Sequence, residues 1–290
     1  MTPTEAELLN MDKPTKMIRD LEGVANLLRQ DVIRMTCEAG SGHPGGSLGA
    51  ADLMAALYFH ALNIDPVNPT WSGRDRFILS KGHACPVLYA ALARRGYFPA
   101  EHLTTLRKTG SILQGHPDML KTPGVDMTTG SLGNGLAVGV GMALGGRMDS
   151  ASFRVYVMLG DGDLQEGCTW EAVMMAGHHK LSNFTAILDY NRAQVDGLVS
   201  DIVDPDPVAE KWLAFNWQVC EIDGNDLPQI LAALAWAKSC KDGPTLILAR
   251  TIKGKGVSFM EAEPVYWHGT APNREQAARA IQELALERKT

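Results

Sequence analysis

The chain has 290 residues with a hydrophobic content of 45%, and this composition excludes an intrinsically disordered protein. Its mild formal net charge of −6 argues against a nucleic-acid-binding surface, which needs a basic stripe. The five cysteines are scattered and lack CxxC or zinc-finger spacing, so we expect reduced thiols in a cytoplasmic protein. Residues 1–16 are polar, so we expect no signal peptide.

The N-terminal half of the chain predicts helices separated by glycine-rich loops. Apolar residues recur at helical spacing over residues 15–38, and this pattern stops at the glycine-rich segment 39–46. In chain order, the segments that follow are a helix over 50–60, a strand over 76–80, a helix ending at 93, a turn at 96–99 with a short helix after it, and a loop over 110–130. Loops of that length inside compact domains are usually functional.

Residues 132–146 form the most apolar segment of the chain. They contain the glycine pairs Gly135–Gly139 and Gly141–Gly145, each with three residues between its members. The segment is too short to span a bilayer, so we expect no membrane association. It predicts a buried helix whose small residues let another backbone approach closely.

From residue 154 onward, strands and helices alternate. Apolar runs at 155–159, 184–188, 217–222 and 245–249 are separated by helical patterns at 165–178, 207–215 and 227–239. This order predicts an α/β fold with a parallel sheet flanked by helices on both faces, in one domain over residues 1–290. Ligands of such sheets bind beyond the carboxyl ends of the strands.

Two of these strands end in polar residues suited to a metal ion. Asp161 lies between two glycines after the strand at 155–159, and Asn191 follows the strand at 184–188. Carboxylate, amide and backbone carbonyl oxygens are ligands that Mg²⁺ or Ca²⁺ prefers. The glycines allow a diphosphate to approach the backbone. The alternative is a strand-end turn with an unrelated asparagine.

Four of the eight histidines lie next to glycine in or at the edge of predicted loops: His43, His83, His116 and His268. Imidazole can donate hydrogen bonds to phosphate or sugar oxygens and can carry protons near neutral pH. The alternative is that each caps a helix or a turn. The histidines lack the spacing of a zinc site, and Asp161 with Asn191 prefers a harder ion.

With these residues in view, the chain resembles the N-terminal, diphosphate-binding half of the transketolases over residues 19–268. The resemblance rests on motifs in a fixed order: Ser41-Gly42-His43-Pro44-Gly45, Arg74-Asp75-Arg76-Phe77, Gly82-His83, Gly115-His116-Pro117, Thr128-Thr129-Gly130-Ser131-Leu132-Gly133-Asn134-Gly135, and the pair Asp161 and Asn191. It implies the thiamine-diphosphate-binding fold and thiamine diphosphate (ThDP) with Mg²⁺ or Ca²⁺ as cofactors.

The resemblance also implies a role for each matching residue. The expected metal ligands are Asp161, Asn191 and the carbonyl of Ala193. The expected catalytic residues, which face the sugar hydroxyls, are His43, His116 and His268. The expected cofactor contacts are His83, Ser131, Leu132, Gly133, Gly162, Glu166, Asn191 and His268. Glu166 and Glu171 resemble the acidic pair that links the cofactor sites across the family's dimer interface, and the alternative is an exposed helix face. Lys253 and Lys255 are expected in a solvated loop, and the alternative is that they help to hold the phosphate at the far end of the sugar.

Transketolases continue into pyrimidine-binding and C-terminal domains, which this sequence lacks, and the family's catalytic glutamate lies there. We therefore expect one subunit of a split transketolase, active only with a partner chain that carries those domains, in a heterotetramer of two of each chain. A terminal amphipathic helix over 272–287 favours a natural chain end. The expected reaction is two-carbon ketol transfer between sugar phosphates, as in the pentose phosphate pathway. The alternatives are a modified-sugar transketolase, a deoxyxylulose-phosphate-type synthase, one subunit of a 2-oxo-acid dehydrogenase, or a non-catalytic cofactor-binding subunit.

Overall fold

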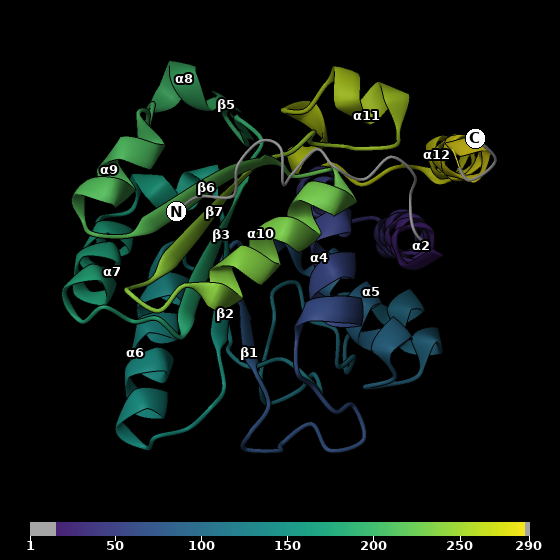
Figure 1. Ribbon diagram of the computed structural model, residues 1–290. Helices are drawn as coiled ribbons and strands as arrows, with labels where there is room; N and C mark the ends of the chain where they lie inside the picture. The colour runs from purple at the N-terminus through teal and green to yellow at the C-terminus, as the bar shows by residue number, and fades with distance from the viewer. Residues whose placement is uncertain (1–15, 288–290) are drawn as a thin grey trace.

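The computed structural model describes residues 16–287, and its centre is a five-stranded parallel sheet in the order β1-β2-β3-β7-β6 (Figure 1). The strands are β1 (Arg76–Leu79), β2 (Val155–Gly160), β3 (Phe184–Tyr190), β6 (Gln218–Asp223) and β7 (Thr245–Arg250). Every residue of β2 and β3 is buried, as expected for apolar runs in a sheet covered on both faces. The sequence-based fold class and these five strands are confirmed.

Helices cover both faces of this sheet because successive strand residues point to opposite sides. Phe77 and Leu79 join one hydrophobic core, and Ile78 between them joins the other. The helices of the first core are α2 (Lys16–Ala39), α4 (Ala51–Ala56), α5 (Cys85–Arg95), α10 (Leu227–Ser239) and α12 (Arg274–Glu287). The helices of the second core are α6 (Asn134–Met148), α7 (Gly167–His178) and α9 (Val208–Ala214).

The predicted helices over 15–38, 227–239 and 272–287 are confirmed by α2, α10 and α12. The helix expected over 50–60 is α4 continued by a π-helical turn, η1 (Leu57–Ala61), and the short helix after residue 99 is the 3₁₀ helix η3 (Ala100–Thr105). The loop over 110–130 contains no helix or strand. Within residues 16–287, no helix is both long and apolar enough to cross a membrane.

Several short elements were not predicted: α3 (Pro44–Gly49), η2 (Gly82–Ala84), η4 (Asp161–Gln165), the hairpin β4 (Ala193–Gln194) and β5 (Gly197–Leu198), α8 (Val199–Ile202), α11 (Ser258–Ala262) and η5 (Tyr266–His268). The hairpin, α8 and α11 lie at the top of Figure 1, above the carboxyl ends of the strands. Segments this short carry no periodic signal, and tertiary contacts define them.

The prediction that residues 132–146 form a buried helix is wrong for one of its two faces. On the buried face of α6, a Cβ added at Gly139 would lie 2.5 Å from Val157 Cγ2, so glycine lets the helix rest directly on β2. On the other face, a Cβ at Gly141 or Gly145 would have no atom within 4 Å. The helix therefore presents an apolar face of small residues that the described chain leaves uncovered.

Candidate active site

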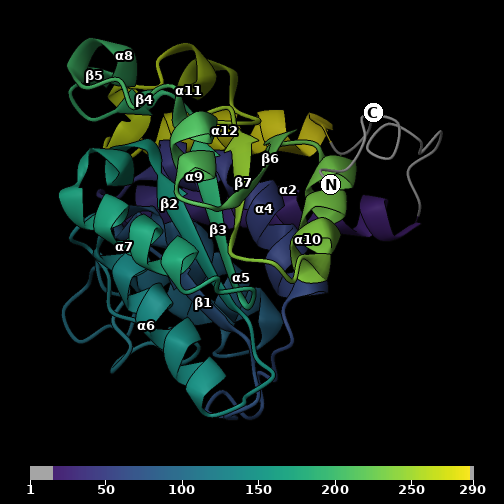
Figure 2. The same ribbon diagram turned by 60° about the vertical axis from the view of Figure 1, so that its left-hand side comes forward.

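The residues expected to bind ligands lie on segments that leave the sheet at one edge. His83 follows β1, Asp161 follows β2 and Asn191 follows β3, and Lys253, which was not among the expected ligand-binding residues, follows β7. Because all five strands are parallel, their carboxyl ends meet at this edge. Figure 2 shows the β4–β5 hairpin, α8 and α11 above it.

Asp161 is held at the tip of β2 by the turn that follows β3. Its Oδ1 accepts the backbone N–H of Asn191 at 3.2 Å, and its Oδ2 accepts the N–H of Arg192. Arg192 has a φ of 64°, a left-handed conformation that is uncommon outside glycine. Burial, followed by the charge of Asp189, raises the pKa of Asp161 to about 7. The turn thus fixes a deeply buried carboxylate.

Asn191 and Ala193 complete a set of oxygen atoms beside Asp161. The side-chain oxygen of Asn191 accepts the N–H of Ala193 at 3.2 Å. The carbonyl oxygen of Ala193 accepts a hydrogen bond from Lys253 Nζ at 2.5 Å. Asn191 and Ala193 therefore lie on the turn after β3, and Asp161 lies on the adjacent turn after β2. The Ala193 carbonyl faces the ammonium group of Lys253.

The expectation that Lys253 lies in a solvated loop is wrong. Lys253 is 4% exposed, and its ammonium also lies 2.8 Å from His268 Nδ1. The backbone of Gly254, with a φ of 85°, donates to the Gly45 carbonyl at 3.0 Å and folds the loop inward. Burial lowers the pKa of Lys253 to about 8. Lys255 is partly buried.

Three of the four predicted histidines form one cluster. The ring centroids of His43, His83 and His268 lie 5.0–5.6 Å apart. Burial is the main cause of a lowered pKa for all three, and neighbouring cations and histidines are the further causes; the pKa is about 4 for His43 and about 3 for His268. All three rings are therefore neutral at physiological pH.

His116 lies at the rim of this cluster and is exposed. A Cβ added at Gly130 would lie 3.5 Å from the His116 ring, so the ring faces the Thr129–Ser131 segment. Burial and Arg107 lower the pKa of His116. Arg107 itself was not predicted, and its guanidinium contacts Ser41, His43 and the Gly115 carbonyl.

The turn at Gly133 is tied to the strand ends by Asp163, which sequence reasoning missed. Asp163 is fully buried and accepts hydrogen bonds from Ser80 Oγ at 2.5 Å and from the N–H groups of Gly133 and Gly160, each at 2.8 Å. A Cβ at Gly133, where φ is 79°, would lie 2.5 Å from Cys168 Sγ. Glycine is therefore required here for both steric and conformational reasons.

The remaining predicted cofactor contacts lie around this turn. Gly162 is open to one side, because an added Cβ would meet only Leu132 Cδ1, at 3.2 Å. Glu166 is the N-cap of α7, and Glu166, Glu171 and Ser131 are all exposed. Glu166 lies beside Gly133. Within residues 16–287, the side chains of Glu166 and Glu171 are exposed and form no hydrogen bond or ion pair.

A second buried group that sequence reasoning missed is the ion pair between Lys81 and Asp189, which are 2% and 0% exposed. Lys81 Nζ also donates to the Gly46 carbonyl at 3.0 Å, and Asp189 accepts a hydrogen bond from Thr251. Lys81 is two residues from His83, and Asp189 is two residues from Asn191. The pair therefore fixes the backbone on which the site is built.

The site has features that fit a metal-bound diphosphate. Asp161, Asn191 and the Ala193 carbonyl offer the hard oxygen atoms that Mg²⁺ or Ca²⁺ prefers. Among residues 16–287, no group of three or more His, Cys, Asp or Glu side chains is placed to hold a metal. Thr129 Oγ1 is buried without a hydrogen-bond partner in the described chain. A cavity of about 460 Å³ adjoins it, lined by Met127–Ser131, Asn134, Gly135, Ala137 and Val138.

Comparison with known proteins gives a consistent result. The sequence profile of the family "transketolase, thiamine diphosphate binding domain" matches residues 22–290. The chain is 46% identical to the 6-deoxy-6-sulfo-D-fructose transketolase subunit of Clostridium sp. (strain MSTE9), and the alignment covers 92% of this chain and 97% of that protein. It is 37% identical to one subunit of the apulose-4-phosphate transketolase of Phocaeicola vulgatus, with 92% and 95% covered.

Longer relatives match only in part. The crystal structure of transketolase from Campylobacter jejuni superimposes with a TM-score of 0.85 at 34% identity, over 94% of this chain and 43% of that one. Rat transketolase is 41% identical over 92% of this chain and 42% of its own length. The chain thus spans less than half of these longer transketolases and nearly all of the two subunits. By sequence and by structure, the chain belongs to the transketolase family, as its thiamine-diphosphate-binding domain.

Proposed function

We propose that this chain binds ThDP through Mg²⁺ or Ca²⁺ and, together with a partner chain, transfers a two-carbon ketol unit from a ketose phosphate to an aldose phosphate. The observation that carries the proposal is the link made by Lys253, which joins the Ala193 carbonyl of the oxygen cluster to His268 of the histidine cluster. A cofactor held at Asp161 and Asn191 would therefore lie beside three neutral imidazoles.

The residues of this chain have distinct roles in the proposed reaction. Asp161, Asn191 and the Ala193 carbonyl would hold the metal, and His83 with Lys253 would face the diphosphate. When bound, ThDP supplies the thiazolium ring that accepts the electron pair of the broken carbon–carbon bond. His43, His116 and His268 would orient the sugar hydroxyls; such groups contribute about 10²–10⁴-fold when they also transfer a proton.

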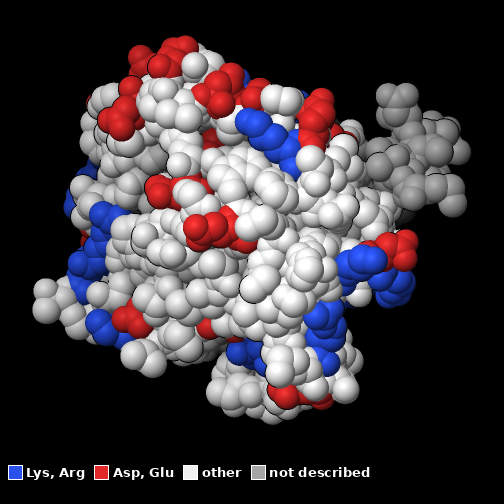
Figure 3. Space-filling model, turned by 90° about the vertical axis from the view of Figure 1, so that its left-hand side faces the viewer, with Lys and Arg blue, Asp and Glu red and all other residues white. Residues whose placement is uncertain are grey.

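A partner chain would supply the groups that activate the cofactor. The uncovered face of α6 supports a docking surface there, since Gly141 and Gly145 are open to any backbone. On α7, Met174 and Met175 are 55% and 47% exposed beside Glu171. In Figure 3, the face that carries α6, α7 and α9 has a broad area without charged side chains. An uncharged area with exposed apolar side chains such as Met174 and Met175 is typical of an interaction site.

We further propose that two copies of each chain form a heterotetramer in the cytoplasm. The two subunit relatives that match nearly full length support the two-chain organisation. The five free cysteines of the described chain are consistent with a reducing compartment.

The test is ketol transfer from xylulose 5-phosphate to ribose 5-phosphate with ThDP and Mg²⁺. It is run on this chain alone, on the candidate partner alone and on the mixture. We expect activity in the mixture only. We expect Asp161→Ala to abolish this activity and the distant His102→Ala to retain it. A mixture that forms a stable complex but does not bind ThDP would refute the proposal.

A modified sugar is the second candidate substrate. It is favoured by the Clostridium and Phocaeicola relatives, whose names specify a sulfonated ketose and apulose 4-phosphate. The same mixture is assayed with 6-deoxy-6-sulfofructose and with apulose 4-phosphate as donors. Turnover of one of these at least ten times faster than xylulose 5-phosphate would replace the pentose phosphate assignment and leave the cofactor site unchanged.

A further inference from the structure

The guanidinium of Arg107 joins two loops at the sugar side of the site, one that carries Ser41 and His43 and one that carries Gly115. Its Nη1 donates to Ser41 Oγ at 2.7 Å. Its Nη2 lies 3.4 Å from His43 Nδ1 and 3.4 Å from the Gly115 carbonyl oxygen. The glycine at 115 permits this approach, because an added Cβ would lie 3.2 Å from Arg107 Nε. One side chain thus contacts the segments that carry His43 and His116.

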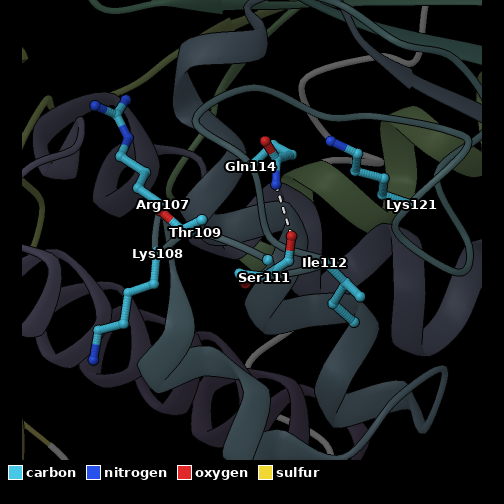
Figure 4. Close-up of a pocket in the computed structure, with 8 residues that line it drawn as sticks. Arg107, Lys108, Thr109, Ser111, Ile112, Gln114 and Lys121 are labelled. Carbon is cyan, nitrogen blue, oxygen red and sulfur yellow. Dashed lines mark hydrogen bonds between the residues drawn. The ribbon is translucent and has the colours of Figure 1, made fainter.

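The backbone at Arg107 adopts a left-handed conformation. Arg107 has a φ of 61°, and its N–H donates to the Leu113 carbonyl at 2.9 Å. Non-glycine residues in this region are strained and persist where surrounding contacts hold them, which is frequent at functional sites. Figure 4 shows Arg107 extending away from Ser111 and from its neighbour Lys108. Lys108 reaches the surface instead and pairs with Glu38 at 3.1 Å.

The contact with His43 determines where the imidazole carries its proton. A guanidinium can donate hydrogen bonds but cannot accept them. Nδ1 of His43 must therefore be the acceptor, so the ring is neutral and its hydrogen is on Nε2. A Cβ added at Gly269 would lie 3.5 Å from this Nε2, so glycine leaves space for a ligand on that side.

We propose that Arg107 is a positioning residue that holds His43 as the neutral Nε2–H tautomer, so that His43 donates a hydrogen bond to a sugar oxygen and does not act as a general base. The identity of the ligand as a sugar rests on the function proposed above. The tautomer rests only on the contact between Arg107 and His43.

The surroundings of His43 agree with a neutral ring. Burial is the main cause of its low pKa, and the charge of Arg107 is the second. Among the described residues, Arg107 forms no ion pair, so no carboxylate offsets its charge. The titratable groups that face His43 are Arg107, His116, Lys253, His83 and His268.

The tautomer is tested by nitrogen-15 NMR of the full chain labelled at histidine, with His43 assigned by the signals lost in His43→Gln. We expect wild-type His43 to show Nε2–H at neutral pH. In Arg107→Met both tautomers become populated, and the His43 pKa rises while remaining below 6.5, because burial persists. Lys108→Met, which removes the adjacent surface cation, leaves the His43 signals unchanged.

Two further variants keep the test decisive. If Arg107→Met does not fold, Ser41→Ala loosens the same guanidinium and gives a smaller shift in the same direction. Arg107→Lys retains a cation that can only donate, but it lacks the planar fork that also binds Ser41 and Gly115, so it should keep the low pKa while its weaker contact with Nδ1 leaves both tautomers populated. A wild-type ring with its hydrogen on Nδ1, or the same tautomer population in wild type and Arg107→Met, would overturn the proposal.

Kinetics of the reconstituted complex separate this inference from the proposed function. Arg107→Met should lower kcat/KM about 10-fold, as expected for one hydrogen bond, with ThDP affinity unchanged. If the complex proves inactive on every sugar while the NMR result holds, the proposed function fails and the role of Arg107 in setting the tautomer stands. If the complex is active and the tautomer is wrong, only this inference fails.

Discussion

Replacing Lys81 with methionine leaves the carboxylate of Asp189 buried without its cation. Both side chains are almost inaccessible, at 2% and 0% exposure, and they join the ends of β1 and β3. In Lys81→Met, the remaining side-chain donor to Asp189 is the hydroxyl of Thr251. Methionine has a similar length, so the change removes the charge and its hydrogen bonds with little change in volume.

The expected loss of stability is large because a buried charge remains unpaired. Removing one partner of a buried ion pair typically costs about 3–5 kcal/mol. Domains are stable by about 5–15 kcal/mol, so this single change consumes a large fraction of the total. The lost donor to the Gly46 carbonyl adds to the effect, since that oxygen is left without its described side-chain partner.

The assay is urea unfolding of wild type, Lys81→Met, Asp189→Leu and the double variant. The double variant should recover most of the loss, because two apolar side chains replace a desolvated pair. The strand neighbours of Asp189 are the small residues Gly160 and Ala249, which limits the crowding that leucine would cause. If Lys81→Met cost less than about 1 kcal/mol, the typical value for an exposed pair, or if the two single losses added in the double variant, the reasoning would be refuted.

Three further predictions concern α6, the metal and pH. Gly139→Ala should lower the unfolding free energy by about 1–3 kcal/mol, because its Cβ would lie 2.5 Å from Val157. Gly141→Ala, on the open face, should raise the unfolding free energy by up to about 1 kcal/mol. The same Gly141→Ala variant should weaken partner binding, which is measured by sedimentation. Asp161→Asn should reduce the Mg²⁺-dependent affinity for ThDP, measured by calorimetry. Loss of a residue that only supports a metal ligand costs about 10–100-fold, and loss of the ligand Asp161 should cost more. If wild type binds ThDP with the same affinity in EDTA, a metal is excluded. His43 has a folded pKa of about 4 against a reference value of 6.5, so the unfolded state binds more protons between these values and stability should fall as pH drops through that interval. Urea unfolding should show a smaller fall for His43→Gln, and equal falls would contradict the low pKa.

The sequence was sufficient to predict the sheet and most of its covering helices, because long apolar segments have a clear periodicity. It also indicated the ligand-binding edge, since Asp161 and Asn191 each follow a strand and parallel strands end together. The short elements above this edge lacked such a signal. The β4–β5 segment, for example, is held by Arg192, which pairs with Asp204 and Asp206 across a loop.

The errors at the site come from contacts between residues distant in sequence. Nothing local distinguishes Lys253 from Lys255, and the difference arises because Gly254 bonds to Gly45 and draws Lys253 inward. Asp163 resembles any acidic residue at a helix start, yet it bonds Ser80, 83 residues away. Arg107 belongs to no recognisable motif, and only the folded structure shows that it lies between the Gly42-His43 and Gly115-His116 segments.

Burial links the stability of this edge to its chemistry. The same packing that lowers the pKa values of His43 and His268 raises that of Asp161, because desolvation disfavours the charged form of either type. The histidines therefore remain neutral hydrogen-bonding groups across the physiological range, and the carboxylate gains most from a divalent cation. Burying these groups costs the isolated chain stability, and a bound metal and cofactor would return part of it through mass action. Residues such as Lys81 and Asp163, which touch no proposed ligand, thus determine how closely the ligand-binding groups can be held together.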